Sequence, residues 1–255
     1  MQERPALPPA PYLVVGLARS GAAIARTLTE HGEVIGVDAG APAGAGALTG
    51  VELHLRSQGV ELLDRARTVV KSPGVPREVA VVAGALRRGL EVTGELELAW
   101  RLLGNRFIAV TGTNGKTTTV ELLGEMHRRA GIPVAVAGNV GTPLAALVGQ
   151  LDPEAVVVCE CSSFQLEDCS AFAPECALLL NLEEDHLDRH GDAGAYREAK
   201  LRIFANQRAG NCGFDPAAVE AETAVSGGWL SVRGEAVVAL EQIRLRGAHN
   251  VENAR

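Results

Sequence analysis

The stretch Ala109–Leu123, "AVTGTNGKTTTVELL", contains the signals that decide the fold. An apolar run leads into a turn bounded by glycines, and a Lys-Thr-Thr sequence then opens an amphipathic helix. This order is typical of a phosphate-binding loop, whose usual signature is G-x-x-x-x-G-K-[ST]. Gly115, Lys116 and Thr117 fill the last three positions, whereas Val110 stands where the first glycine belongs. The pattern predicts a nucleotide site in an α/β fold, with one departure from the signature to explain.

Each residue type in this loop suits a nucleotide phosphate. The glycines let backbone amides point at phosphate oxygens, Lys116 brings a compact positive charge, and Thr117 offers a hydroxyl to Mg²⁺. A glycine turn before an ordinary helix is the alternative, but it does not account for Gly-Lys-Thr-Thr directly at the helix start. The loop residues predicted to contact the nucleotide are Gly112, Thr113, Asn114, Gly115, Lys116, Thr117 and Thr118.

Two later apolar runs end in side chains that can bind a metal. The run "VVVCE" predicts a buried strand ending on Glu160, where P-loop enzymes place an acidic metal partner. Capping of the next helix is the alternative function of this carboxylate. The run "ALLLN" is followed by "LEEDHLDRH", in which His186 is the strongest candidate ligand and His190 is more typical of a loop. Lys200, in a helix predicted over 195–204, would by itself indicate only a surface lysine.

The N-terminal part predicts a second unit of nucleotide-binding type. A strand, "YLVVG", runs into a glycine turn and a helix, and a second strand ends on Asp38. This is the layout of a dinucleotide-binding fold. Ala18 replaces the middle glycine of G-x-G-x-x-G, which weakens the case for NAD, although the helix N-terminus would still suit a diphosphate. Asp38 is either a ligand contact or a turn former. The residues predicted to face this ligand are Arg19, Ser20, Gly21, Asp38, Ser72, Pro73 and Gly74.

Composition narrows the class of protein. The chain has 255 residues, 47% of them apolar, and a net charge of −7, which argues against a general nucleic-acid binder. No run of about 18 apolar residues is present, so we expect no membrane segment. The N-terminus, "MQERPALPPAP", lacks the apolar core of a secretory signal. None of the five cysteines forms a C-x-x-C pair. We expect Cys159 and Cys161 to be buried thiols, and a reducing compartment, the cytoplasm.

These patterns predict an α/β protein with two domains. Residues 1–94 are expected to form a Rossmann-like domain with a parallel sheet. Residues 95–255 are expected to form an α/β domain like those of P-loop NTPases, with a small β element near the end.

Four motifs in order, TGTNGKTTT, ECSSFQLE, NLEEDHLDRH and GAHNVENA, resemble those of the ATP-dependent Mur ligases of peptidoglycan synthesis. The resemblance spans nearly the whole chain. It also accounts for Val110, because these ligases carry a shorter loop, T-G-T-N-G-K-[ST]. "SSFQLE" and "EDHLDRH" are similar to members of the family that add D-glutamate to UDP-N-acetylmuramoyl-L-alanine through an acyl phosphate.

The resemblance implies roles for individual residues. UDP rather than NAD would bind the first domain, and ATP with two Mg²⁺ ions the second. Thr117 and Glu160 would hold one Mg²⁺, and His186 with a carbamylated Lys200 the other; Lys116, His186 and Lys200 are the implied catalytic residues. The remaining implied contacts are Asn250 and Asn253 with the adenine region, and Asn139, Ser162 and Gln165 with the sugar and alanine.

The chain departs from the family pattern at two places. It stops at Arg255, so we expect the C-terminal domain that brings the acceptor amino acid to be absent, and ligation by this chain alone to be weak or undetectable. The family also has a strand and an Asn-Ala-Asp-Asp-like turn after the helix of Lys200. Neither is apparent in "FANQRAGNCGFDPAAVEA", residues 204–221.

Three other functions compete with this reading. A sister Mur ligase would add a different amino acid, and an NAD-dependent oxidoreductase would use the first domain. A GTPase-like switch would need a guanine-reading N-K-x-D after a strand, which "NLEED" does not supply. We expect small-molecule partners only and a monomer.

Overall fold

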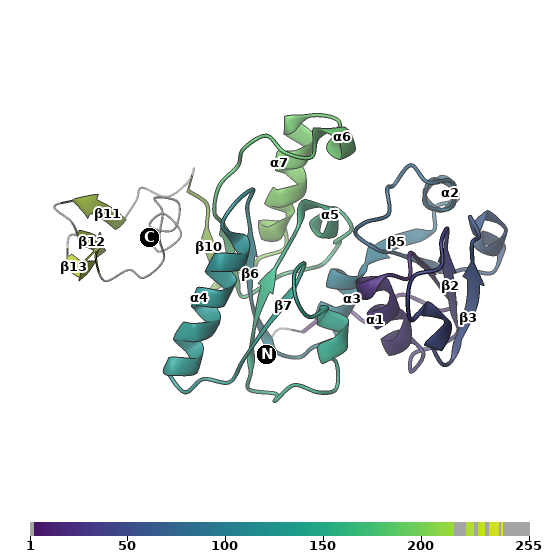
Figure 1. Cartoon of the computed structure of the whole chain (residues 1–255), viewed down its shortest axis with the longest axis horizontal. Helices are drawn as coiled ribbons and strands as arrows, with labels where there is room; N and C mark the ends of the chain where they lie inside the picture. The colour runs from purple at the N-terminus through teal and green to yellow at the C-terminus, as the bar shows by residue number, and fades with distance from the viewer. Residues whose placement is uncertain (1–2, 217–222, 227–228, 233–234, 240, 242–255) are drawn as a thin grey trace.

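The computed structural model describes residues 3–216, 223–226, 229–232, 235–239 and 241. Two parallel five-stranded sheets, each with its own helices, lie side by side, and a small three-stranded antiparallel sheet follows them (Figure 1). The predicted class, two α/β domains with parallel sheets, is confirmed. None of the helices in the described ranges is long and apolar enough to cross a membrane.

The first sheet has the strand order β3-β2-β1-β4-β5, with all neighbours parallel. The central strand, β1, is buried at all four residues, as expected for a parallel strand covered on both faces. The strands of this first sheet are β1 (Tyr12–Val15), β2 (Val34–Asp38), β3 (Val51–Leu55), β4 (Thr68–Lys71) and β5 (Glu91–Gly94). Its helices are α1 (Arg19–Leu28), η1 (Ala45–Ala47), η2 (Val60–Asp64) and α2 (Ala80–Arg87).

The second sheet has the order β10-β9-β6-β8-β7, again parallel throughout, and places β6 at its centre. Its strands are β6 (Arg106–Thr111), β7 (Val134–Gly138), β8 (Val156–Glu160), β9 (Cys176–Leu179) and β10 (Cys212–Phe214). Its helices are α3 (Glu95–Leu102), α4 (Lys116–Arg129), η3 (Leu144–Leu147), α5 (Ser163–Leu166), α6 (Leu187–His190), α7 (Ala193–Leu201) and η4 (Arg202–Phe204). The small sheet contains β11 (Thr223–Ser226), β12 (Trp229–Val232) and β13 (Glu235–Ala239).

One expectation was wrong, because a strand does follow the helix of Lys200. β10 pairs in parallel with β9, and Cys212 lies opposite Cys176. All three residues of β10 are exposed, so this edge strand lacks the buried apolar run by which strands such as β1, β8 and β9 were predicted.

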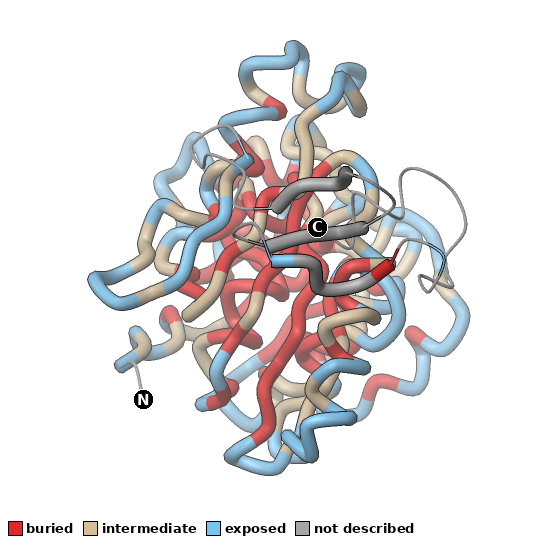
Figure 2. The backbone as a smooth tube through the Cα atoms, turned by 90° about the vertical axis from the view of Figure 1, so that its left-hand side faces the viewer, coloured by how far each residue is buried: buried red, intermediate tan, exposed pale blue. Residues whose placement is uncertain are grey.

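The loops that follow the buried strands lie at the carboxyl ends of the two parallel sheets. Figure 2 shows the strands as a buried interior surrounded by exposed connections. In open parallel sheets, ligands bind beyond the carboxyl ends of the strands, where the strand order reverses. The turns after β1 and β4 in the first sheet, and after β6, β8 and β9 in the second, are therefore the places to look for a site.

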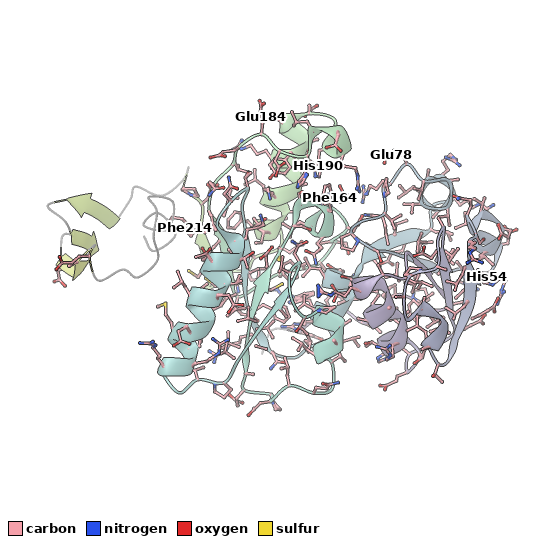
Figure 3. All side chains as sticks on the ribbon, in the orientation of Figure 1. His54, Glu78, Phe164, Glu184, His190 and Phe214 are labelled. Atoms are coloured by element: carbon pink, nitrogen blue, oxygen red, sulfur yellow. The ribbon has the colours of Figure 1, made fainter. Side chains whose placement is uncertain are left out.

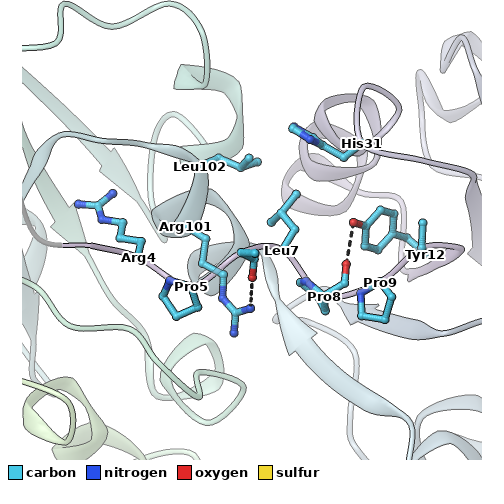
Figure 4. Close-up of a pocket in the computed structure, with 11 residues that line it drawn as sticks. Arg4, Pro5, Leu7, Pro8, Pro9, Tyr12, His31, Arg101 and Leu102 are labelled. Carbon is cyan, nitrogen blue, oxygen red and sulfur yellow. Dashed lines mark hydrogen bonds between the residues drawn. The ribbon is translucent and has the colours of Figure 1, made fainter.

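The N-terminal segment ties the two sheets together. The Arg4 guanidinium donates to the carbonyls of Trp100 and Asn105 and lies 4.9 Å from the centroid of the Trp100 ring. Further on, the Tyr12 hydroxyl donates to the Pro8 carbonyl at 2.8 Å (Figure 4). A shallow cavity of about 480 Å³ lies beside this segment. β5 ends at Gly94 and α3 begins at Glu95, which is where the sequence places the domain boundary; the boundary itself remains a prediction.

Candidate functional site

The phosphate loop lies between the central strand of the second sheet and α4. Val110 is fully buried in β6, in register with Glu160 on one side and Leu178 on the other. It is thus a strand residue, and the loop proper is only residues 112–115. Gly115 caps α4 in a left-handed conformation (φ 84°) that favours glycine. The short loop explains why no glycine is needed at position 110.

Two lysines meet at the same backbone carbonyl of this loop. Lys116 Nζ donates to the carbonyls of Gly112 and Thr113, both at 2.9 Å, and Lys200 Nζ donates to the Gly112 carbonyl at 2.7 Å. Lys200 is buried, and its desolvation, followed by the charge of Lys116, lowers its pKa to about 8. The ammonium lies 4.7 Å from the centroid of the Tyr196 ring. This concentration of positive charge beside a helix N-terminus suits a polyphosphate.

Oxygen ligands for a divalent cation lie directly beside the loop. Glu160 is buried, and its Oε2 accepts a hydrogen bond from the Thr117 hydroxyl at 2.7 Å, while Oε1 accepts one from the Asn139 amide at 3.0 Å. Hydroxyl and carboxylate oxygens are ligands that Mg²⁺ prefers, with water and substrate phosphates completing its shell. Across the part of the chain that is described, no group of three or more His, Cys, Asp and Glu side chains is placed to hold a metal. The oxygens of Thr117 and Glu160 fit Mg²⁺ bound jointly with a phosphate ligand.

Asn181, which sequence reasoning treated only as the end of a strand, holds the phosphate loop in shape. Its Oδ1 accepts from the backbone amides of Thr113 (3.0 Å) and Asn114 (2.8 Å), and its Nδ2 donates to the Asn114 carbonyl at 3.1 Å. Glu183 adds a second tie, since its carboxylate accepts from the Asn114 amide at 3.1 Å. The available signals were the position of this asparagine at the end of an apolar run and at the start of the NLEEDHLDRH motif.

The two predicted histidines have different surroundings. His186 caps α6 with a positive φ of 50°, and its side chain is half exposed beside Asp185. The His190 side chain is only 4% exposed; its ring stacks on that of Phe164 with centroids 5.0 Å apart and places Nε2 2.9 Å from the Ser163 hydroxyl. Burial, and then the nearby His186, lower the pKa of His190. Figure 3 shows His190 and Phe164 close together, whereas Glu184 lies at the outer edge of the domain.

In the described residues, no hydrogen bond or ion pair joins His186 to Lys200. Their joint coordination of a second Mg²⁺ remains a prediction.

The "SSFQLE" motif forms the start of α5. Ser162 accepts from the backbone amide of Gln165, and the Gln165 side chain accepts from the Ser162 amide, which together make a capping box. Gln165 is buried, so both predicted substrate contacts are already engaged in the helix cap. Their contact with substrate remains a prediction, and Asn139 is the better exposed candidate of the predicted three.

The first domain has a cavity of about 210 Å³ at the carboxyl ends of its strands. Of the predicted residues, Asp38 and Gly74 line it. Ser57 and Gln58 line it as well and were not predicted, because nothing in the local sequence marks them. Val15, Gly16, Val37, Ala39, Val75, Pro76, Val79 and Val81 complete the wall.

Asp38 also organises the turn at this cavity. One carboxylate oxygen accepts from the Leu17 amide and the other from the Gly40 amide, both at 2.7 Å. The Ser72 hydroxyl donates to the Gly16 carbonyl at 2.7 Å and so joins the ends of β1 and β4. Asp38 is thus a turn former that also lines the cavity, and its contact with a ligand remains a prediction.

The helix that follows this turn begins as predicted. Arg19, Ser20 and Gly21 are the first three residues of α1, so their amides belong to its first turn. A Cβ at Gly21 would lie 1.8 Å from the Gly16 carbonyl oxygen, which shows how closely the helix packs on the turn. Pro73 lies in the turn after β4 without lining the cavity. Asn250 and Asn253 lie outside the described residues.

Comparison with known proteins agrees with this geometry. Residues 110–226 match the family profile of the Mur ligase middle domain. Over 95% of its length the chain is 43% identical to the UDP-N-acetylmuramoylalanine–D-glutamate ligase of Pelotomaculum thermopropionicum. It is 34% identical, again over 95% of its length, to the protein of the same name from Bacillus subtilis. The chain belongs to the Mur ligase family. It spans 61% and 60% of the length of these two Mur ligases.

Solved structures of Mur ligases share the fold. A UDP-N-acetylmuramate:L-alanyl-γ-D-glutamyl-meso-diaminopimelate ligase from Neisseria meningitides aligns with a TM-score of 0.60 and 22% identity over 95% of this chain and 90% of that one. The UDP-N-acetylmuramate–alanine ligase of Thermotoga maritima aligns with a TM-score of 0.55 and 20% identity over 95% of this chain and 62% of that one. At these identities the likeness concerns the two-domain fold.

Proposed function

We propose that the protein containing this chain is an ATP-dependent ligase that adds D-glutamate to UDP-N-acetylmuramoyl-L-alanine in the cytoplasm. The observation that carries the proposal is the phosphate loop with Lys116, Lys200 and the Thr117–Glu160 pair, in a chain whose relatives bear that ligase name. The choice of D-glutamate depends on those relatives alone.

The ATP site would be the loop 112–115 and the first turn of α4. Amides at the helix N-terminus and the ammonium of Lys116 would bind the β- and γ-phosphates. At present Lys116 donates to two loop carbonyls, and phosphate oxygens would replace these acceptors. Asn181 supports this role indirectly, because its side chain accepts from the amides of Thr113 and Asn114 and so fixes the shape of the loop, while the phosphates would bind the amides at the start of α4.

The uridine diphosphate would bind in the first domain. The cavity at Asp38 and Gly74 is lined partly by apolar side chains, as a base pocket requires. The first turn of α1, at Arg19, Ser20 and Gly21, would receive the diphosphate. The muramoyl-alanine end would then extend to the central domain, towards Asn139.

The reaction transfers phosphate first and forms the amide second. A carboxylate oxygen of the alanine attacks the γ-phosphorus of ATP, and the bond to the ADP oxygen breaks. The D-glutamate amine then attacks the acyl carbon, loses a proton, and phosphate leaves from the tetrahedral intermediate. The chain's contribution is to position the two substrates and to stabilise negative charge through Lys116 and the loop amides.

Thr117 and Glu160 would hold Mg²⁺ next to the loop. When bound, the ion neutralises charge on the phosphates. A second ion at His186 and Lys200 is the finer part of the proposal. Burial lowers the pKa of Lys200 to about 8, which raises the fraction of neutral amine that could react with CO₂ and release a proton. The resulting carbamate would replace the positive charge of Lys200 by a carboxylate-like oxygen ligand.

An NAD-dependent oxidoreductase is the alternative from another class, and a sister ligase is the alternative within the family. Titrations of the chain with UDP and with NADH, followed by intrinsic fluorescence, separate the first alternative. Phosphate release by the protein with UDP-N-acetylmuramoyl-L-alanine, ATP and either D-glutamate, L-alanine or diaminopimelate separates the second. We expect UDP to bind in preference to NADH and D-glutamate alone to support turnover; tight NADH binding without UDP binding would refute the proposal.

A further inference from the structure

A buried group of charged residues joins the two domains beside the cavity of the first domain. Lys71, the last residue of β4, is completely buried, and its Nζ lies 2.8 Å from Asp168 Oδ2 and 3.5 Å from Glu167 Oε1. Asp168 is almost fully buried as well, and both acids follow α5 in the central domain. Arg77 of the first domain lies 3.0 Å from Asp168 Oδ1. We call these four residues the junction cluster.

The junction cluster pins both ends of the turn that forms one wall of the cavity. Lys71 precedes this turn and Arg77 ends it, and both bind the carboxylate of Asp168. Lys71 Nζ also donates to the Val75 carbonyl within the turn, at 3.1 Å. Gly74, Val75 and Pro76, which line the cavity, lie between these anchors.

Among the described residues, Lys71 forms its ion pairs with carboxylates of the other domain. These carboxylates are those of Glu167 and Asp168. Asp168 packs closely over β5, since its Cβ lies 3.4 Å from the place where a Cβ of Gly94 would be. A buried charge without a partner is costly, so the first domain depends on the central domain to neutralise Lys71.

Glu167 also connects the junction cluster to the part of the central domain that carries the proposed ATP site. Glu167 Oε2 lies 3.9 Å from Nδ1 of His190, and His190 in turn contacts the Ser163 hydroxyl. Burial and the charge of Asp168 raise the pKa of Glu167. A continuous set of contacts therefore runs from the turn of the first domain to α5 and α6 of the central domain.

We propose that Lys71, with Arg77, is a positioning residue that fixes the uridine cavity relative to the phosphate loop, so that one substrate can reach both. This inference deepens the proposed function and rests on it. A ligand that spans two sites gains affinity from the second site only when the geometry allows both to be occupied together. UDP and ADP each need one domain, whereas the muramoyl substrate needs the two domains held in the correct relation.

The test compares Lys71→Met and Arg77→Gln with the wild-type chain by calorimetric titration with UDP, with Mg-ADP and with UDP-N-acetylmuramoyl-L-alanine. Arg77 is 39% exposed and provides a variant that should fold even if Lys71→Met does not. Arg88→Gln is the matched control, because it removes the same charge from an exposed ion pair with Asp64 inside the first domain.

We expect both variants to keep UDP and ADP affinity within about threefold and to lose about tenfold or more in affinity for the muramoyl substrate, while Arg88→Gln changes none of the three. Lys71→Arg should restore part of the loss. Unchanged affinity for the muramoyl substrate, or an equal loss for all three ligands in folded variants, would overturn the positioning role.

Hydrogen exchange separates failure of this inference from failure of the proposed function. Amides of the turn 72–77 should exchange about tenfold faster in Arg77→Gln than in Arg88→Gln, because the turn loses one of its anchors. If the wild-type chain binds neither UDP nor the muramoyl substrate, the proposed function is wrong. The exchange rates of the turn amides still decide whether the junction cluster holds the turn. Equal exchange rates of these amides in Arg77→Gln and Arg88→Gln would show that the junction cluster does not hold the turn.

Discussion

Replacing Glu95 by glutamine should make the protein more stable at alkaline pH and remove part of its pH dependence. Glu95 is the first residue of α3 and is only 1% exposed, at the junction with η3. Its Oε1 accepts from the Ala145 amide at 2.7 Å, whereas Oε2 is buried without a hydrogen-bond partner among the described residues. Burial raises the pKa of Glu95 from 4.5 to about 7.

The direction in which the free energy of unfolding changes with pH follows from proton linkage. Because the pKa of Glu95 is higher in the folded than in the unfolded chain, the folded state binds the proton more tightly. The stabilisation is complete below pH 4.5 and is lost as the pH rises through about 7. Each pKa unit corresponds to about 1.4 kcal/mol, so the full effect is about 3 kcal/mol. Between pH 5 and pH 8 the wild type should lose about 2.5 kcal/mol through this group.

Glutamine keeps the oxygen that accepts from Ala145 and carries no charge at any of these pH values. Urea unfolding of the wild type and of Glu95→Gln at pH 5, 6, 7 and 8 gives the difference in free energy of unfolding. That difference should rise by about 2 to 3 kcal/mol in favour of the variant from pH 5 to pH 8. Other titrating groups are common to both proteins and cancel.

Glu97→Gln is the matched comparison on the same helix. Glu97 is buried, and its Oε1 lies 2.8 Å from Nε of Arg101. Its Oε2 accepts hydrogen bonds from the backbone amides of Ser170 and Phe172. Its substitution should destabilise the protein by about 2 to 3 kcal/mol, because the largely buried guanidinium of Arg101 loses its nearest carboxylate and keeps only Glu91, at 3.9 Å, as an ion-pair partner among the described residues. A difference between wild type and Glu95→Gln that stays constant from pH 5 to pH 8 would show that Glu95 is charged in the folded protein and that the reasoning is wrong.

Three further substitutions test the two nucleotide sites. Gly21→Ala should destabilise the first domain by at least about 2 kcal/mol in urea unfolding, because its Cβ would overlap the Gly16 carbonyl oxygen; a stability within 0.5 kcal/mol of wild type would count against this packing. Asn181→Ala should weaken Mg-ADP binding about tenfold by calorimetry, since two loop amides lose their acceptor, and unchanged affinity would contradict that role. Thr117→Val should remove most of the Mg²⁺ dependence of ADP binding while leaving Glu160 in place; an unaltered Mg²⁺ dependence would argue against this cation site.

Local sequence patterns were enough to predict the central strands and the phosphate loop. β1 and β6 are buried apolar runs that lead into glycine turns, and such runs can be recognised without any tertiary information. Lys116 and Thr117 were placed by their spacing from Gly115. The exposed edge strand β10 was missed for the opposite reason, since it has no buried face to leave a pattern.

The contacts that were not predicted depend on which strands become neighbours. Asn181 holds the phosphate loop only because β9 lies beside β6 in the sheet. Lys71 and Asp168 pair across two domains and lie far apart in the sequence. Asn181 opens the NLEEDHLDRH motif, but the motif alone does not show that its side chain binds the loop, and neither Lys71 nor Asp168 belongs to one of the four motifs.

The central claim, that ATP activates the alanine carboxylate, is tested most directly by following oxygen. UDP-N-acetylmuramoyl-L-alanine labelled with ¹⁸O in its carboxylate is incubated with the protein, Mg-ATP and D-glutamate, and the released phosphate is examined by mass spectrometry. Attack of the carboxylate on the γ-phosphorus followed by amide formation must transfer one labelled oxygen to each phosphate. Phosphate carrying one ¹⁸O and dependent on D-glutamate is the predicted result; unlabelled phosphate would contradict the account.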